Sequence, residues 1–291
     1  MLFQEACAEY MAEKARKVRA NTLEGYESGL RCHVLPAWGL RELAGISHAE
    51  LQAWVDSVPT AGAAAKAFKC FRQVYRWALR RLQLRVWDVT QGIELPRAAP
   101  RRREQLSAAD VRRVLRAVEG EPYEAVVVAC ASLGLRPSEA AGLDWSDVDW
   151  RSGWVHVRRG AHSVGRGTVE YPCKTELSDR WLRLPRFALA RLRELRGSRR
   201  RGRMRGELSP RQIYGRLKRL LRRVGLGRAS VQLLRHAWAT VAISAGAALE
   251  DVAVALGHSS VEMCRRHYLL STRAVVERSQ WFFTRAVLKG A

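Results

Sequence analysis

Residues 96–103 read Pro-Arg-Ala-Ala-Pro-Arg-Arg-Arg, so two prolines and four arginines fall within eight positions. Proline removes a backbone donor and fixes φ, and the arginines leave no apolar face to bury. The stretch therefore predicts an extended basic linker and not a core element. The chain of 291 residues is long enough for a separate hydrophobic core on each side of it. We therefore expect one domain in residues 1–95 and a second in residues 104–291.

Residues 1–95 contain four segments with helical periodicity. The second begins with Asn21 and Glu24 at capping spacing and is predicted to stop at Pro36, because proline interrupts a helix. The fourth, residues 61–82, carries an apolar stripe and a separate basic stripe. A charged stripe is usually a solvated helix face, but this one contains no acidic residue, which favours contact with phosphates. The basic stripe consists of Lys69, Arg72, Arg76 and Arg80.

The second predicted domain is helical at both ends, with strand-like runs between. A strongly apolar helix is expected at residues 124–135, and helices resume from Phe187. Between them, alternating runs joined by Gly-rich and polar turns predict a small antiparallel β-sheet in a chain that is otherwise mainly α. Six arginines within residues 196–205 predict a mobile loop, either a solvated tether or a direct grip on a polyanion. The strand-like runs are 154–158, 168–171 and 181–184.

Residues 232–268 concentrate arginine, histidine and tyrosine side chains in a segment that otherwise predicts three short buried helices. Ser230 is placed to cap the first helix. Gly257 suits the left-handed residue that ends the second. We therefore expect polar groups from three helices to converge on one point.

The chain carries 51 Lys and Arg against 28 Asp and Glu, a formal net charge of +23. Such an excess indicates a polyanionic partner, and nucleic acid is the first candidate. We expect contact with it through the basic stripe of residues 61–82 and through the linker. No apolar run approaches the roughly 18 residues that span a bilayer, and glutamates interrupt the N-terminal region, so a cytoplasmic protein without a membrane partner is expected. The linker arginines are Arg101, Arg102 and Arg103.

The sequence predicts neither a metal nor a cofactor. Six cysteines are scattered without metal-ligand spacing and are expected to be reduced. There is no Gly-rich Lys-Ser/Thr loop for ATP and no His-Glu-x-x-His motif for zinc. Asp144, Asp147 and Asp149 are the one carboxylate cluster whose spacing suits magnesium, but they lie in a turn-like stretch with few other ligands.

Three separated stretches share one explanation. Ser-Leu-Gly-Leu-Arg-Pro-Ser-Glu-Ala places Arg136 where an apolar helix breaks, and Tyr-Pro-Cys-Lys-Thr places Lys174 in a turn between strands. The third stretch is the run 232–268. Together they resemble the catalytic signature of the tyrosine recombinase, or phage integrase, family over nearly the whole chain. The matching residues, in family order, are Arg136 with Glu139, Lys174, Arg235 with His236, His258 and Tyr268.

The resemblance implies DNA cleavage and rejoining through a 3′-phosphotyrosine intermediate, and phosphoryl chemistry explains the residue types. Tyr268 would be the nucleophile. Arg136 and Arg235 would neutralise the non-bridging oxygens of the transition state with fork geometry, in place of metal ions. Lys174 would protonate the departing deoxyribose oxygen, and His258 would donate to the phosphate. Because the phosphotyrosine keeps the energy of the ester, no ATP is required.

The chain departs from the family pattern at Gln232, where members usually have a histidine three residues before the second arginine. An amide can still hydrogen-bond the phosphate but cannot take up a proton, so any proton-transfer role there is lost or passes elsewhere. Many members have the tyrosine one residue earlier, where this chain has His267. Only a hydroxyl forms the stable ester, which favours Tyr268. His236 and Glu139 are expected in supporting positions.

The resemblance also implies an assembly on double-stranded DNA. A helical core-binding domain and an α+β catalytic domain would form a C-shaped clamp, with four protomers on two duplexes and the last helix docked on a neighbouring subunit or on its own domain. With no further domain before the four-helix part, binding to core sites alone is expected, and partners can include accessory DNA-bending or directionality factors. The leading prediction is an integrase of a phage or other mobile element. The alternatives are a DNA-binding protein that lost catalysis through Gln232 and a single-protomer nicking and closing enzyme.

Overall fold

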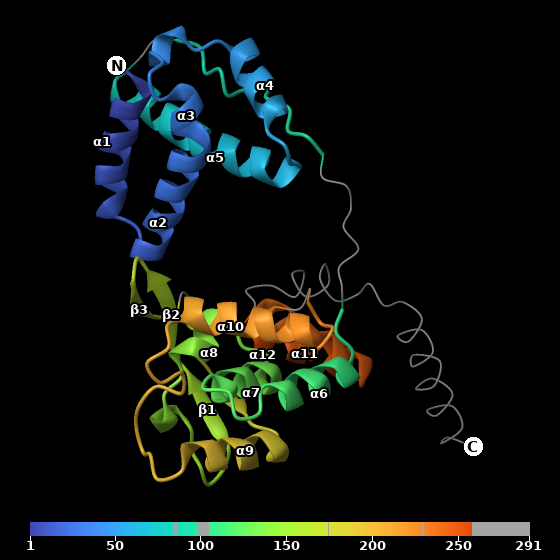
Figure 1. Cartoon of the computed structure of the whole chain (residues 1–291). Coiled ribbons are helices and arrows are strands. Elements are labelled where there is room, and N and C mark those ends of the chain that lie inside the picture. Colours follow the sequence, from blue (N-terminus) through green and yellow to red (C-terminus); the bar gives the residue numbers. More distant parts are fainter. Residues whose placement is uncertain (84–85, 98–104, 174, 228–229, 258–291) are drawn as a thin grey trace, which may run out of the picture. The chain divides into compact units, whose positions relative to one another are not determined.

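The computed structural model describes residues 1–83, 86–97, 105–173, 175–227 and 230–257. The chain divides into two compact units, Met1–Arg103 and Glu104–Ala291 (Figure 1). Both units are mainly helical, and short antiparallel strands occur in the second, which confirms the predicted fold class. Within these ranges no helix is both long enough and apolar enough to cross a bilayer. The linker arginines Arg101, Arg102 and Arg103 lie outside the described residues.

The first unit consists, in chain order, of α1 (Phe3–Ala15), α2 (Ala20–Gly29), the π-helical turn η1 (Leu30–Val34), α3 (Leu35–Trp38), the 3₁₀ turn η2 (Leu43–Gly45), α4 (His48–Ser57) and α5 (Ala61–Arg81). Its core centres on Phe71 of α5, which is fully buried. The Phe71 ring stacks on Phe3 of α1, with centroids 4.8 Å apart, and meets Trp38 of α3 edge-on at 5.4 Å. Aromatic packing across three helices thus fixes α5 and the stripe that it carries.

The structure differs from the prediction at Pro36. The second helix does not stop there, because α2 continues through η1 into α3, which ends at Trp38. Pro36 lies in the first turn of α3. The π-helical turn directly before it shifts the hydrogen-bond pattern, with the N–H of Leu35 bonded to the carbonyl of Leu30, and a helix can accommodate a proline beside such a local adjustment.

The second unit contains α6 (Ala108–Ala117), α7 (Glu124–Leu133), α8 (Pro137–Gly142), the 3₁₀ turn η3 (Trp145–Asp147), β1 (Trp154–Val157), β2 (Arg159–Val164), β3 (Gly167–Pro172), the 3₁₀ turn η4 (Glu176–Ser178), β4 (Arg180–Arg183), α9 (Arg186–Arg196), α10 (Pro210–Arg223), α11 (Val231–Ser244) and α12 (Leu249–Leu256). Every residue of α7 is buried, so this helix is the central element of the unit. The apolar helix predicted at residues 124–135 is thereby confirmed, and it ends two residues earlier.

The strands form two separate antiparallel pairs, β1 with β4 and β2 with β3. The predicted runs correspond to β1, β3 and β4, but β2 was missed, and the single predicted sheet is wrong. β2 contains Gly160, which weakens a strand pattern. The structure gives the reason for this glycine, because a Cβ on Gly160 would lie 3.2 Å from the side chain of Ser138 on α8, and a Cβ on Gly142 would lie only 3.0 Å from the Cα of Gly160. The strand therefore passes close to the backbone at the end of α8.

Two helices end at left-handed glycines. α7 is followed by Gly134 with φ of 63°, and α12 by Gly257 with φ of 64°, as predicted for Gly257. A Cβ on Gly134 would lie 2.8 Å from the ring of Trp238 and 3.0 Å from Leu256. A Cβ on Gly257 would lie 2.8 Å from the backbone oxygen of Leu177. Both positions therefore require glycine for packing as well as for φ.

Candidate active site

Arg235 lies where the ends of α7 and α12 meet. It is in the first turns of α11, whose predicted N-cap, Ser230, accepts a hydrogen bond from the backbone N–H of Leu233. Nη1 of Arg235 donates to the carbonyl of Gly134 at 2.9 Å, and Nη2 donates to that of Leu256 at 2.8 Å. Its side chain is only 2% exposed. The cation thus binds the C-terminal ends of two helices, where the helix dipoles favour positive charge.

Arg136 reaches the same helix end from the turn between α7 and α8. It is the N-cap residue of α8 and has an extended backbone. Its Nη2 donates to the carbonyl of Gly257 at 2.8 Å, and its Nη1 donates to Oε1 of Glu139 at 2.6 Å. In contrast to Arg235, its side chain is 34% exposed. The structure therefore brings together the two arginines that the sequence predicts for phosphate binding, and it leaves Arg136 open to solvent.

Glu139 is the buried carboxylate that these arginines share. Its Oε1 lies 2.6 Å from Arg136, and its Oε2 lies 3.1 Å from Arg180 and 3.9 Å from Arg235. Burial acts to raise the pKa of the carboxyl, but Arg180 and Arg136 outweigh this effect and hold the pKa below its ordinary value. Glu139 therefore stays ionised and orients the guanidiniums around it.

Sequence reasoning missed Arg180, the first residue of β4. Its side chain is only 8% exposed, and its Nε donates to the carbonyl of Ala255 at 2.7 Å. Arg235 and Arg136 bind the next two carbonyls, so three successive carbonyls at the end of α12 each accept a hydrogen bond from an arginine. Nothing in the local pattern distinguishes Arg180 from Arg183 on the same strand, because the partners of Arg180 are distant in the chain.

The other predicted site residues divide into two groups. Gln232 and His236 lie one turn apart at the start of α11, with Gln232 exposed and His236 half-buried. Ala239, about one turn further along α11, packs in a small buried cluster with residues of α12. Outside the described residues lie Lys174, His258 and Tyr268.

Most of the basic stripe of α5 lines a shallow pocket in the first unit. The pocket has a volume of about 260 Å³, and its walls include Tyr10 and Trp77. Arg76 pairs with Asp88 at 2.7 Å, an acidic partner beyond the helix that the stripe pattern does not reveal. Lys69 is exposed but lies outside the pocket. The stripe residues at the pocket are Arg72, Arg76 and Arg80.

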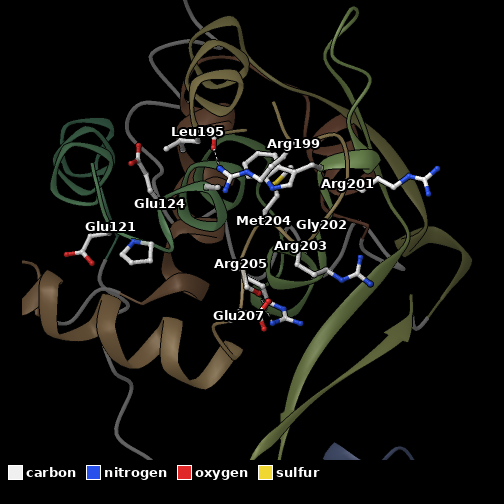
Figure 2. Close-up of a pocket in the computed structure, with 14 residues that line it drawn as sticks. Glu121, Glu124, Leu195, Arg199, Arg201, Gly202, Arg203, Met204, Arg205 and Glu207 are labelled. Carbon is white, nitrogen blue, oxygen red and sulfur yellow. Dashed lines mark hydrogen bonds between the residues drawn. The ribbon is translucent and has the colours of Figure 1, made fainter. Parts of the chain in front are cut away.

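A second pocket, of about 590 Å³, is rimmed by the arginine-rich loop after α9 (Figure 2). It lies at the beginning of α7, a 10-residue helix, so roughly 15 Å separate it from the arginine cluster at the other end. Arg199 lies over the ring of Trp145 at 5.6 Å, and Arg203 pairs with Asp144 at 2.9 Å and with Glu170 at 2.5 Å. The prediction of a solvated tether is therefore wrong, because ion pairs and an aromatic ring hold the loop to the unit.

The three aspartates considered for magnesium do not converge. Asp147 is buried and pairs with Arg158 at 3.0 Å and Arg159 at 2.5 Å. Asp144 pairs with an arginine of the loop after α9, and Asp149 accepts hydrogen bonds from the turn that follows it. Among the residues that the structure describes, no group of three His, Cys, Asp or Glu side chains is placed to hold a metal ion.

Comparisons with known proteins agree with the resemblance seen in the motifs. The model of the phage integrase family matches residues 104–274, and that of the phage integrase N-terminal SAM-like domain matches residues 2–58. Tyrosine recombinase XerD of Pseudomonas aeruginosa is 30% identical over 269 residues, which cover 86% of this chain and 85% of that protein. Tyrosine recombinase XerC of Xylella fastidiosa is 27% identical over 267 residues, which cover 84% of this chain and 85% of that protein.

Two solved structures show the same fold at low identity. The Tn1549 transposon integrase in complex with transposon right end DNA superposes with a TM-score of 0.77 at 15% identity, covering 98% of this chain and all of that one. A lambda integrase dimer bound to a core site superposes with a TM-score of 0.71 at 18% identity, covering 94% of this chain and 79% of that one. The match of the family model to most of the second unit, around the arginine cluster, decides the assignment. The chain belongs to the phage integrase family of tyrosine recombinases, enzymes that recombine DNA at specific sites.

Proposed function

We propose that the chain cleaves and rejoins double-stranded DNA through a 3′-phosphotyrosine on Tyr268. The observation that carries the proposal is the arginine cluster at the end of α12. There Arg136 and Arg235 bind successive carbonyls, and Arg136 keeps 34% of its side chain exposed. A guanidinium fixed by a buried carboxylate is pre-organised to bind a phosphate oxygen and to stabilise its charge as it grows in the transition state.

Each remaining role follows from the chemistry of strand cleavage. The phenol of Tyr268, with an ordinary pKa of about 10, must lose its proton as it attacks phosphorus. The bond that breaks releases the 5′ oxygen of deoxyribose, and Lys174 supplies the proton that this oxygen needs. His258 directly follows Gly257, whose carbonyl accepts from Arg136, and it donates to the phosphate. Support for these three residues comes from their order in the sequence.

Gln232 supports a second candidate, a DNA-binding protein of the same fold without catalysis. Its side chain is exposed in the first turn of α11, one turn before His236. An amide there can donate to the phosphate but cannot exchange a proton with it. The two candidates differ in one observable, because only the enzyme forms a covalent bond to DNA.

The assembly and the source are part of the same proposal. Both units carry surface arginines, and related folds have been solved on DNA as a lambda integrase dimer on a core site and as a tetramer on a Holliday junction. We expect a clamp around DNA, a tetramer during strand exchange, and a cytoplasmic location. The relatives by sequence carry the names XerC and XerD, whereas the transposon and phage integrases are similar in fold alone. An origin in a mobile element therefore remains a prediction, and sequencing of the DNA flanking the gene tests it.

Covalent capture tests the proposal without knowledge of the DNA site. A library of random-sequence duplexes, each with a nick that lets the released strand diffuse away, is incubated with the protein, and adducts that survive denaturation are recovered and sequenced. We expect the wild-type protein to enrich one sequence, Tyr268→Phe to give no adduct, and the matched control Tyr123→Phe, which alters a phenol at the opposite end of α7, to retain it. Salt-sensitive binding without any adduct would select the second candidate. Adducts formed by Tyr268→Phe would refute the nucleophile.

A further inference from the structure

Arg180 connects three elements of the second unit from a nearly buried position. Its Nη2 lies 3.1 Å from Oε2 of Glu139 on α8, and its Nε donates to the carbonyl of Ala255 on α12 at 2.7 Å. Its Nη1 donates to the carbonyl of Ser178 in η4 at 3.0 Å. A planar guanidinium can satisfy these acceptors together because its donors point in fixed, divergent directions, which a lysine ammonium cannot reproduce.

We propose that Arg180 is a positioning residue of the strand-transfer site, which engages Glu139 and the end of α12 so that Arg136 remains available to the phosphate. This inference rests on the proposed function. Arg180 does not itself meet the DNA, because its side chain is only 8% exposed, whereas that of Arg136 is 34% exposed.

The division of the Glu139 carboxylate between two arginines carries the argument. Arg136 donates from Nη1 to Oε1 and from its backbone N–H to Oε2, while Arg180 donates from Nη2 to Oε2 at 3.1 Å and from Nη1 to Oε1 at 3.4 Å. One Nη2 proton of Arg136 is donated to the carbonyl of Gly257. Because an arginine has five N–H donors, the hydrogen bonds with described residues leave Nε and the second Nη2 proton of Arg136 for an anion.

Removal of Arg180 would change what Arg136 does. Glu139 is 4% exposed, and without Arg180 its Oε2 would retain the backbone N–H of Arg136 and the guanidinium of Arg235 at 3.9 Å, so the buried charge would have one close cation fewer. We expect Arg136, whose Nη1 is already 2.6 Å from Oε1, to rotate into a two-pronged pair with the carboxylate and to turn its other donors away from the phosphate. The carbonyl of Ala255 would also lose its partner, at the helix end that precedes His258.

The pH dependence of cleavage separates this role from a general structural one. The charged groups that face Glu139 in the described residues are Arg136, Arg180 and Arg235, and the thiols of Cys130 and Cys173 lie in its electrostatic surroundings. With Arg180 replaced by a neutral residue, burial raises the pKa of Glu139 with one fewer cation to oppose it. Cleavage by the variant should therefore decline as the pH falls over a range in which the wild-type rate is constant.

The test compares Arg180→Gln with Arg183→Gln, which removes an exposed arginine from the same strand. On the duplex recovered by covalent capture, we expect Arg180→Gln to lower the single-turnover cleavage rate roughly 10–100-fold, with a Kd for DNA within about threefold of wild type and a new decline towards acidic pH. Arg183→Gln should match the wild type in rate and pH profile. Arg180→Lys should fall between them, since it keeps the charge but not the divergent donors.

A double-mutant cycle with Glu139→Gln completes the test. If Arg180 acts through Glu139, its replacement in the Glu139→Gln background should lower the rate by less than about threefold. Additive losses would overturn the proposal, and so would wild-type rates and pH profiles for folded Arg180→Gln. If Arg180→Gln melts below the assay temperature, Arg180→Lys decides, because a wild-type rate in that variant would overturn the proposal as well. Adduct formation by the wild-type protein distinguishes failure of the proposed function from failure of the role of Arg180. If the wild type forms no adduct, the proposed function is refuted. If the wild type forms adducts and the Arg180 variants cleave as fast as it does, only the role of Arg180 is refuted.

Discussion

Replacement of Gly134 by alanine should destabilise the second unit more than its backbone conformation alone requires. Gly134 has φ of 63°, and an L-residue there costs about 1–2 kcal/mol. The added Cβ would also lie 2.8 Å from the ring of Trp238 and 3.0 Å from Leu256. Trp238 cannot yield freely, because its Nε1 donates to the carbonyl of Ser132 at 3.0 Å. Relieving such overpacking costs about 1–3 kcal/mol more.

The matched control is Gly206→Ala. Gly206 has φ of 56°, and a Cβ built on it meets no atom within 4 Å, so its replacement carries the backbone cost without the clash. Thermal unfolding followed by circular dichroism should place the melting temperature of Gly134→Ala roughly 2–12 °C below that of Gly206→Ala, which is the packing cost converted for a unit of this size. Equal melting temperatures would refute the claim that close packing, and not φ alone, selects glycine at the end of α7.

Three further predictions concern charge and thiol chemistry. Because the folded-state pKa of Glu139 is depressed, its stabilisation is complete above the unfolded pKa of about 4.3 and is lost as pH falls through the folded value. Between pH 7 and 3 the melting temperature of Glu139→Gln should therefore change less than that of the wild type. At pH 7 the substitution should lower the free energy of unfolding by about 3–5 kcal/mol. Arg72→Ala should weaken DNA binding and reduce the slope of log K against log salt concentration by about 1, without changing the melting temperature. Arg76→Ala should lower the melting temperature, because it removes the ion-pair partner of Asp88. Equal effects of the two substitutions on binding and melting would contradict the distinction. Burial raises the pKa of the Cys130 thiol to about 12, so a thiol reagent at pH 8 should label exposed Cys32 and leave Cys130 unmodified until the protein unfolds, as peptide mapping would show.

Local chemistry made part of the fold predictable. Ser230 caps the start of α11 and Gly257 terminates α12, as expected, because a hydroxyl cap and a left-handed glycine depend on a few adjacent residues. Pro36 misled the prediction, because its effect depends on its position within a helical turn, and the π-helical turn before it is not visible in the pattern. β2 was missed because its pairing partner and its close contact with α8, and not its own alternation, decide its conformation.

The site was predictable where its residues stand in recognisable motifs. Arg136 and Arg235 do, and the structure brings them to one helix end. Arg180 stands in no such motif, since its carboxylate partner is 41 residues away and its local pattern is that of a strand surface. The loop after α9 was misjudged for the same reason, because the acidic partners of Arg203 lie 33 and 59 residues earlier in the chain. Long-range ion pairs are set by tertiary folding and leave no periodic trace.

The arginines bound to the end of α12 also bear on the order in which the second unit folds. They lie 121, 75 and 21 residues from their acceptors, and the apolar cluster that buries α12 is small. Contacts between such distant residues form only after the loops between them have closed. We therefore expect α12 to dock last, on a scaffold already assembled around α7. In hydrogen exchange its amides should open in a partial unfolding step that leaves α7 protected.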